Sequence, residues 1–136
     1  MKKIILFISV LFLVVSCSNQ ESVVAEAARE ADKACPKTVD FATTMDRVMY
    51  THGDLVYNFT VNDDIIPMED LDAKIEQLST NIEAAMRLPQ TKPLLEACKD
   101  ADVDIVYNYR GSNSGRSIEV TYNPNSGKFS YRHLND

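Results

Sequence analysis

The chain has 136 residues, a mass of 15.3 kDa and a net charge of −6, from 14 basic and 20 acidic residues. Its 45% of hydrophobic and 25% of charged residues are the proportions of a globular protein, and they exclude a disordered or collagen-like chain. The acidic balance argues against a nucleic-acid partner, because such binding depends on Lys and Arg that neutralise phosphates. The length corresponds to one domain.

The first residues have the pattern of an export signal. Lys2 and Lys3 form a short basic start, and residues 4–15 are apolar except for one serine. A membrane-spanning helix needs about 20 apolar residues, whereas a secretory signal has an apolar centre of roughly 7–15 residues followed by a small residue. We therefore expect residues 1–16 to be a signal peptide that is removed from the mature protein.

The end of this signal resembles a bacterial lipobox. Val14-Val15-Ser16-Cys17 has an aliphatic residue, a tolerant position, a small residue and then cysteine, although Leu is commoner than Val at the first position. The resemblance implies that Cys17 receives a diacylglycerol, becomes the mature N-terminus and is acylated, for instance with palmitate. It places the protein on the cell membrane or outer membrane, facing the periplasm or the surface. The alternative is an ordinary secretory signal in which Cys17 is incidental.

The mature chain, residues 17–136, has 120 residues and a net charge of −8 after Lys2 and Lys3 are lost. Anionic headgroups repel such a chain, so the lipid on Cys17 must hold it to the membrane. We expect residues 17–36 to form the anchor and an N-terminal helix, and residues 37–136 to form a single α+β domain.

Two further cysteines follow Cys17. An exported compartment permits disulfides, so we expect Cys35 and Cys98 to be bonded. The bridge would close a loop of 64 residues, for which loop-closure entropy gives roughly 4 kcal/mol. The alternative is a pair of unbonded, buried thiols. Neither cysteine lies in a CxxC motif or has a histidine at catalytic spacing, which argues against a thiol enzyme.

The first expected element is a helix over residues 20–34. Ser18 and Glu21 fit a capping box, five alanines favour helix, and Pro36 ends it. The apolar side of this helix is narrow and consists mostly of small residues around Val24. Such a helix suits close packing on a sheet, or it could stand partly free as a stalk above the membrane.

Strand patterns follow up to residue 61. The apolar alternation over residues 39–51 changes phase, which predicts a bulge or bend near residues 43–47. A turn at His52-Gly53-Asp54 comes next. Residues 55–61 then alternate strictly and form the clearest strand of the chain, paired with the preceding segment in a hairpin.

The middle of the chain predicts two helices. Pro67 suits a first helical turn, and Pro89 ends the first helix, which we expect over residues 67–88. A shorter helix follows from Thr91 to about Asp100. Apolar residues spaced 4, 3, 4 and 4 apart give the first helix one buried face: Leu71, Ile75, Leu78, Ile82 and Met86.

The last third predicts a three-stranded meander, with strands near residues 103–109, 118–122 and 129–131. The whole order, α-β-β-α-α-β-β-β, predicts an α+β fold: an antiparallel sheet of about five strands with helices on one face. The 67–88 helix needs an apolar surface, so the odd-numbered residues of the strands near 55–61 and 103–109 should face it, and their even-numbered residues should face the free side. The expected open face includes Val56, Asn58, Val106 and Asn108.

One segment is repeated at an offset of 50 residues. Residues 54–59 (DLVYNF) and 104–109 (DIVYNY) are identical at four of six positions and conservative at the other two. One interpretation is a duplicated unit. The interpretation that we favour is two similar central strands with aromatic inner faces, because β-rich chains reuse such residues.

Two candidate metal-binding patterns, an EF-hand loop and a histidine pair, do not fit the sequence. Residues 100–104 begin like an EF-hand loop, but Ile105 and Gly111 stand where that loop needs Gly and Glu. His52 and His133 lack a ligand partner at helical spacing. The sequence therefore predicts no metal and no other cofactor.

Aromatic residues are concentrated in the predicted strands. A buried Tyr needs a partner for its hydroxyl, and eight rings exceed what a small core comfortably holds. They either fill the core with their tips reaching water, or some of them line a groove or an exposed face. The eight are Tyr50, Tyr57, Phe59, Tyr107, Tyr109, Tyr122, Phe129 and Tyr131. We expect Tyr50, Tyr122 and Tyr131 to be the exposed ones and the candidate binding residues.

Two function classes remain. The favoured one is a lipid-anchored, non-enzymatic module that binds an envelope protein, peptide or glycan. An immunity-type toxin inhibitor is one version, since an acidic surface suits a basic toxin. The alternative is a small envelope hydrolase that uses a carboxylate pair, although no spacing of Asp and Glu singles out a pair and no catalytic residue is predicted.

Overall fold

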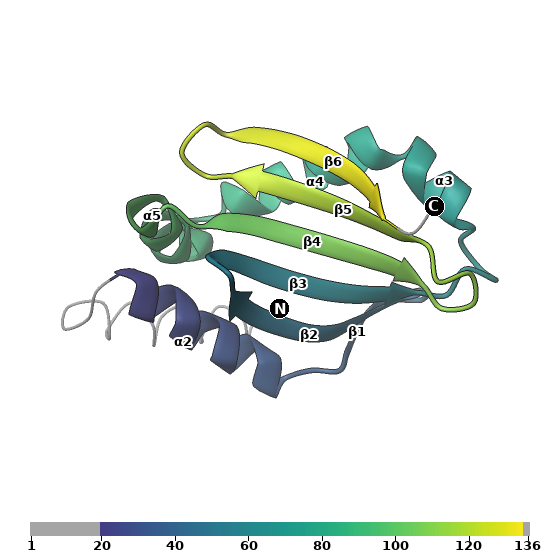
Figure 1. Cartoon of the computed structure of the whole chain (residues 1–136), viewed down its shortest axis with the longest axis horizontal. Helices are drawn as coiled ribbons and strands as arrows, with labels where there is room; N and C mark the ends of the chain where they lie inside the picture. Colours follow the sequence, from purple (N-terminus) through teal and green to yellow (C-terminus); the bar gives the residue numbers. More distant parts are fainter. Residues whose placement is uncertain (1–19, 135–136) are drawn as a thin grey trace.

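The computed structural model describes residues 20–134, which form a six-stranded sheet with helices on one side (Figure 1). The α+β class is therefore confirmed. In chain order the elements are α2 (Gln20–Lys33), β1 (Lys37–Asp40), β2 (Thr43–Thr51), β3 (Asp54–Val61), α3 (Met68–Ala73), α4 (Ile75–Met86), a 3₁₀ turn (Pro89–Thr91), α5 (Lys92–Ala101), β4 (Asp104–Gly111), β5 (Ser117–Asn123) and β6 (Lys128–Leu134). None of these helices combines the length and the apolar character needed to cross a membrane.

The strands lie in the sheet in their order along the chain, from β1 to β6. Neighbouring strands are antiparallel, except that β3 and β4 are parallel. The expected fully antiparallel sheet was wrong at this central pair. Residues 62–103 carry the chain through α3, α4 and α5 and return it to the end of the sheet where β3 began, so β4 must run in the same direction.

The sheet has six strands rather than about five because the 39–51 segment is divided. A turn at Phe41 and Ala42 separates β1 from β2. A second irregularity, a bulge, follows inside β2 between Met45 and Arg47. The bulge lies within the predicted 43–47 interval, and together the two features account for the change of phase in the sequence.

The predicted helices are present with adjusted ends. The N-terminal helix spans Gln20–Lys33, close to the predicted 20–34, while its proposed cap at Ser18 lies outside the described residues. The expected 67–88 helix is two helices that meet at Lys74, whose φ of −103° departs from helical geometry. The α5 helix ends at Ala101, and the next residue, Asp102, adopts the left-handed conformation with φ of 57°.

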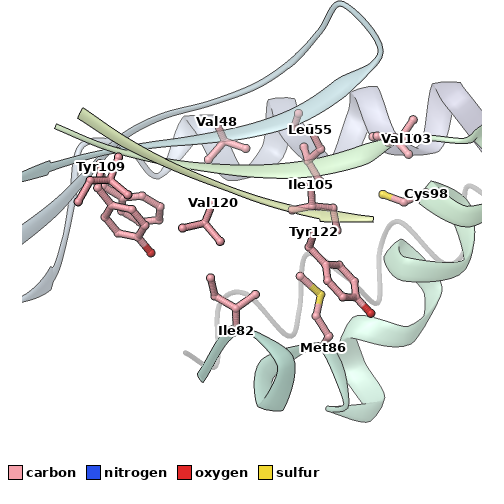
Figure 2. Packing of buried hydrophobic residues seen from close by; sticks show 14 of the residues in the cluster. Val48, Leu55, Ile82, Met86, Cys98, Val103, Ile105, Tyr109, Val120 and Tyr122 are labelled. Carbon is pink, nitrogen blue, oxygen red and sulfur yellow. The ribbon is translucent and has the colours of Figure 1, made fainter. Parts of the chain in front are cut away.

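One hydrophobic core joins the helices to the inner side of the sheet (Figure 2). Leu55 and Ile105 are almost fully buried at the start of β3 and β4, and Ile82 and Met86 of α4 face the sheet from the other layer. The odd-numbered residues of β3 and β4 therefore face the helices, as predicted. Burial of these side chains, each contributing about 1.5–3 kcal/mol, supplies most of the stabilisation.

The N-terminal helix belongs to the same core and is not a free stalk. Val23 and Val24 are 1% and 0% exposed. The helix runs along β2 at one side of the sheet (Figure 1), where the Asp32 carboxylate accepts a hydrogen bond from the Val48 amide at 3.0 Å. This contact satisfies an amide that β2 would otherwise direct to solvent.

Candidate functional site

The two repeated segments are direct neighbours in the sheet. They pair in parallel without a shift, from Asp54 opposite Asp104 to Val61 opposite Gly111, so each residue of the repeat lies beside its own counterpart. β3 ends one antiparallel meander, whereas β4 begins the next. Because the copies hold different places in their meanders, the topology favours two similar central strands over a duplicated unit.

The helix-facing side of this pair carries four stacked rings, which we call the aromatic floor: Tyr57, Phe59, Tyr107 and Tyr109. The Tyr57 and Tyr107 rings lie 5.2 Å apart and are 9° from parallel. The Phe59 and Tyr109 rings lie 4.8 Å apart at 12°. The in-register pairing places like beside like at the spacing of neighbouring strands, about 4.8 Å, and this spacing suits stacked rings.

The aromatic floor lies between two helices that pack against opposite halves of the sheet. On one side α2 contacts β2 through Asp32. On the other side the Ser79 hydroxyl of α4 lies 2.9 Å from the Tyr131 hydroxyl of β6. Figure 1 shows α2 along β2 and α4 behind the β5 and β6 half. Phe59 and Tyr109 are each 8% exposed, whereas Tyr57 and Tyr107 are half-buried although they lie on the helix-covered side.

The three tyrosine hydroxyls of the floor are desolvated. Burial raises the pKa of Tyr57, Tyr107 and Tyr109 above the usual value near 10, so all three stay protonated and neutral. Within residues 20–134 none of them has a hydrogen-bond partner. Figure 2 shows the Tyr109 hydroxyl directed away from the sheet, toward the helix layer. Among the described residues, each hydroxyl is therefore a hydrogen-bond donor without an acceptor.

This arrangement suits binding more than acid–base chemistry. Ring faces bury apolar groups, and neutral hydroxyls donate hydrogen bonds to carbonyl oxygens. A base that works near neutral pH would need a lowered pKa, which is the opposite of the shift at Tyr57, Tyr107 and Tyr109.

The even-numbered residues lie on the opposite side of the same strands, as predicted, but this side is not freely exposed: Val106 is only 7% exposed, and Val56, Asn58 and Asn108 are half-buried. The Asn108 side-chain amide donates to the Asn58 side-chain oxygen at 3.2 Å, while the Asn108 oxygen is buried without a partner. Farther across this face Arg132 pairs with Glu119 at 3.0 Å. The expected exposed aromatics are absent from the described part of this face.

The open face also holds the nearest approach to a carboxylate pair. Asp54 and Asp104 are partners in the parallel ladder. Burial raises the pKa of Asp54, and the charges of Asp104 and Glu119 raise it further. The Asp104 carboxylate already accepts a hydrogen bond from the Asn123 amide at 3.0 Å.

The three predicted binding tyrosines do not form a site. Tyr122 is only 8% exposed, which corrects the expectation that it is free. Tyr50 is half-buried and its hydroxyl donates to Glu21 at 2.8 Å. Tyr131 is 43% exposed. Their ladder partners Leu55, Ile105 and Val120 are inner-face residues, so all three lie on the helix-facing side, spread from β2 to β6.

The predicted disulfide is not confirmed, because Cys35 and Cys98 are both free thiols in the structure. Cys35 follows the end of α2, and its thiol donates to the Ala31 carbonyl at 3.6 Å. Cys98 is fully buried in α5, and burial raises the pKa of its thiol to about 12. A thiol this hard to ionise is a poor nucleophile. Cys17, the predicted lipidation site, lies outside the described residues.

A hollow of about 350 Å³ lies at the end of the sheet where β3 and β4 finish. At its side, Asp63 accepts hydrogen bonds from the backbone amides of Asn113 and Ser114 at 3.0 and 2.9 Å. These bonds lower the pKa of Asp63. A side chain at Gly111 would collide with the same carboxylate, which explains the glycine. Through these hydrogen bonds, Asp63 stabilises the turn between β4 and β5.

The two histidines are not brought together. His52 lies in the turn between β2 and β3 with φ of 52°, and His133 in β6 pairs with Asp72 at 3.1 Å. Within residues 20–134 no group of three His, Cys, Asp or Glu side chains could hold a metal ion.

Sequence reasoning missed the aromatic floor as a unit, although its members were identified and placed on the inner face. The missing step was the parallel pairing of β3 with β4. A signal for it was available, since two near-identical segments at an even offset of 50 residues would stack residue on residue if they paired in parallel.

The chain belongs to a family known as "Domain of unknown function (DUF8479)", which matches residues 18–118. No curated protein matches the chain. Two solved structures share its fold. A "putative secreted protein" from Pseudomonas aeruginosa has a TM-score of 0.65 and 9% identity, over 80% of this chain and 93% of that one. A pilotin from the Vibrio vulnificus type 2 secretion system has a TM-score of 0.51 and 13% identity, over 85% and 86%.

Proposed function

We propose that this DUF8479 member is a lipid-anchored protein of the cell envelope that binds an apolar segment of another envelope protein on the aromatic floor, without catalysis. The carrying observation is the stacked Tyr57–Tyr107 pair. These rings are half-buried on the helix-covered side, and their hydroxyls have no partner within residues 20–134. Half-buried aromatic faces with unused donors are typical of binding pockets.

The location in the envelope rests on two supports. The first is the lipobox-like segment from Val14 to Cys17. The second is the fold, which occurs in a protein described as secreted and in a pilotin of a secretion system. α2 begins three residues after Cys17, so an anchor on that cysteine would tether the domain by at most about 10 Å of chain.

A protein segment fits the floor better than a glycan or a basic toxin. The stacked rings offer mainly apolar surface, and each of the three hydroxyls can donate one hydrogen bond to a backbone carbonyl. A glycan would bring many hydroxyls that need acceptors as well as donors. A basic toxin would bind carboxylates, and those of Asp54 and Asp104 lie on the open face rather than on the floor.

The Asp54–Asp104 pair keeps the hydrolase as the second candidate, because Asp54 has the raised pKa that a general acid needs. Asp54→Asn separates the two functions. We expect this variant to retain partner binding in full, because the pair lies on the opposite side of the sheet from the floor. Envelope hydrolysis that disappears in this variant would establish the enzyme instead.

The test of the floor uses the full-length chain with Tyr57→Phe and Tyr107→Phe together. These changes keep both rings and remove two hydroxyls, so the fold remains while two hydrogen bonds to the partner are lost. At about 0.5–1.5 kcal/mol each, the loss lowers partner recovery from solubilised envelope by about 5- to 150-fold.

Tyr131→Phe is the matched control, because it removes a tyrosine hydroxyl that binds Ser79 away from the floor. Its partner recovery stays at the wild-type level. Equal recovery by the double variant and the control would overturn the proposed site.

The anchor is tested separately by mass spectrometry of the N-terminal peptide. We expect a mature N-terminus at Cys17 that carries acyl chains, and a Cys17→Ser protein that is no longer retained in the membrane fraction. Cleavage at another residue, or an unmodified Cys17, would contradict the lipoprotein proposal.

A further inference from the structure

The two outer sides of the sheet differ in how their backbone is covered. On one side the outermost strand, β1, has only four residues, and α2 extends along β2 beyond it. There Asp32 accepts the Val48 amide at 3.0 Å and pairs with Arg47 at 3.3 Å. Helices and short strands of this kind protect a sheet from further pairing.

On the other side β6 is seven residues long and pairs only with β5 among the described strands. Outside that ladder, the backbone of residues 129–133 makes no hydrogen bond within the described part of the chain. Residues 130–133 are exposed and Phe129 is half-buried. In the described part of the chain, the outer edge of β6 is therefore a row of unpaired backbone donors and acceptors.

The charge of β6 is opposite to that of the molecule. The chain has a net charge of −6, but Lys128 and Arg132 are the charged residues of β6 apart from His133. Both project on the open face, where Arg132 pairs with Glu119 and Lys128 has no ion pair within residues 20–134. On the other side of the strand lie Phe129 and Tyr131.

The distribution of charged and apolar side chains on β6 indicates which kind of strand can pair with its free edge. A second copy would place another basic strand beside Lys128 and Arg132 and would bring two acidic molecules together, which is electrostatically unfavourable. A strand with carboxylates at every second position would meet both cations. Its intervening apolar residues would lie beside Phe129 and Tyr131.

We infer that β6 accepts an extended, alternately acidic and apolar segment of a partner protein as a seventh strand. Backbone hydrogen bonds to the free edge supply the affinity, and Lys128 and Arg132 select the acidic register. The edge lies two strands away from the aromatic floor of β3 and β4, so this is a second contact surface, independent of the proposed function.

The probe is a seven-residue peptide, blocked at both ends, that alternates Glu and Val and begins and ends with Glu. It is added to the isotopically labelled chain, and amide exchange is followed by NMR. We expect slower exchange at alternate amides of residues 129–133, and binding at least about 10-fold tighter than that of the same peptide with Lys in place of Glu.

Variants of the two cations of β6 test whether these charges determine how the acidic peptide aligns with the strand. The pair Lys128→Gln with Arg132→Gln weakens binding of the acidic peptide by about 10-fold or more, and Lys128→Glu with Arg132→Glu weakens it further. Arg29→Glu is the control, because it breaks an exposed pair with Glu26 at 2.7 Å on α2, which lies along β2 on the other side of the sheet from β6 (Figure 1). This control binds like the wild type.

Several results would overturn the inference: equal binding of the acidic and basic peptides, no change in the exchange of β6 amides, or dimers that form through β6 without peptide. The last result would show that a second copy is the occupant. None of these results depends on Tyr57 or Tyr107, so failure here leaves the aromatic floor untouched.

Discussion

The two faces of the β3–β4 pair have the same backbone register but opposite consequences. Toward the helices the register stacks Tyr57 on Tyr107 and Phe59 on Tyr109, an arrangement that aromatic rings favour. Toward solvent it places Asp54 beside Asp104, an arrangement that carboxylates disfavour. In-register pairing of similar strands therefore places like side chains side by side on both faces. The stacked rings stabilise the helix-facing side, whereas the neighbouring carboxylates repel each other on the opposite side.

Removing one ring of the floor has the largest effect. Phe59→Ala deletes the ring that stacks on Tyr109 and faces Tyr107, at a position only 8% exposed. The free energy of unfolding falls by about 3–5 kcal/mol, measured by urea titration. Thr121→Ala on the open face changes it by less than about 1 kcal/mol. Equal losses at the two positions would mean that the faces contribute alike.

Asp63→Ala, at the end of the sheet where β3 and β4 finish, has an intermediate effect on the stability of the fold. Amide hydrogen bonds from Ser114 and Asn113 lower the pKa of Asp63, so its contribution to stability is complete above the ordinary pKa near 4 and is lost as the pH falls below it. The urea midpoint of the variant is lower than that of the wild type at pH 7, and the difference shrinks toward pH 2.5. Asp64→Ala serves as the control, and a constant difference at all pH values would contradict this role.

Asp54→Asn has the smallest effect, with the opposite sign. Burial and the neighbouring Asp104 charge raise the pKa of Asp54, so its ionisation costs stability as the pH rises through that value. The variant is more stable than the wild type at pH 7 by about 0.3 kcal/mol, because solvent screens most of the repulsion. The advantage disappears at pH 3 in urea titrations. A variant that is less stable at pH 7 would show that Asp54 makes a favourable contact instead.

Much of the fold could be predicted from local patterns. The strict alternation of residues 55–61 fixed both the strand and its inner face, and the helix-facing position of the odd-numbered residues followed from the needs of the 67–88 helix. Proline positions and apolar spacing located the helices to within a few residues. These features depend on neighbours close in sequence, which is why one chain sufficed to find them.

Long-range pairing could not be derived in the same way. The direction of β4 depends on the path of residues 62–103, which no local pattern encodes, and so the sheet was expected to be antiparallel throughout. The prediction of the binding residues was wrong for the same reason, because burial also depends on contacts between segments that are distant in the chain. Tyr122 was expected to be exposed because the opposing Met86 of α4, shown in Figure 2, comes from a distant segment. The strand signal that begins at Val39 was predicted, but the division of the 39–51 segment into β1 and β2 was not, because the apolar Val39 and Phe41 are exposed rather than buried in one continuous strand.

The central claim is that the aromatic floor, and not the open face, contacts the partner. The most direct measurement is photo-crosslinking in cells with benzoylphenylalanine in place of Tyr107, compared with the same residue in place of Thr121. The account predicts crosslinks from position 107 to an apolar segment of one envelope protein, identified by mass spectrometry, and none to that segment from position 121. Crosslinks to the partner from position 121 alone would contradict it.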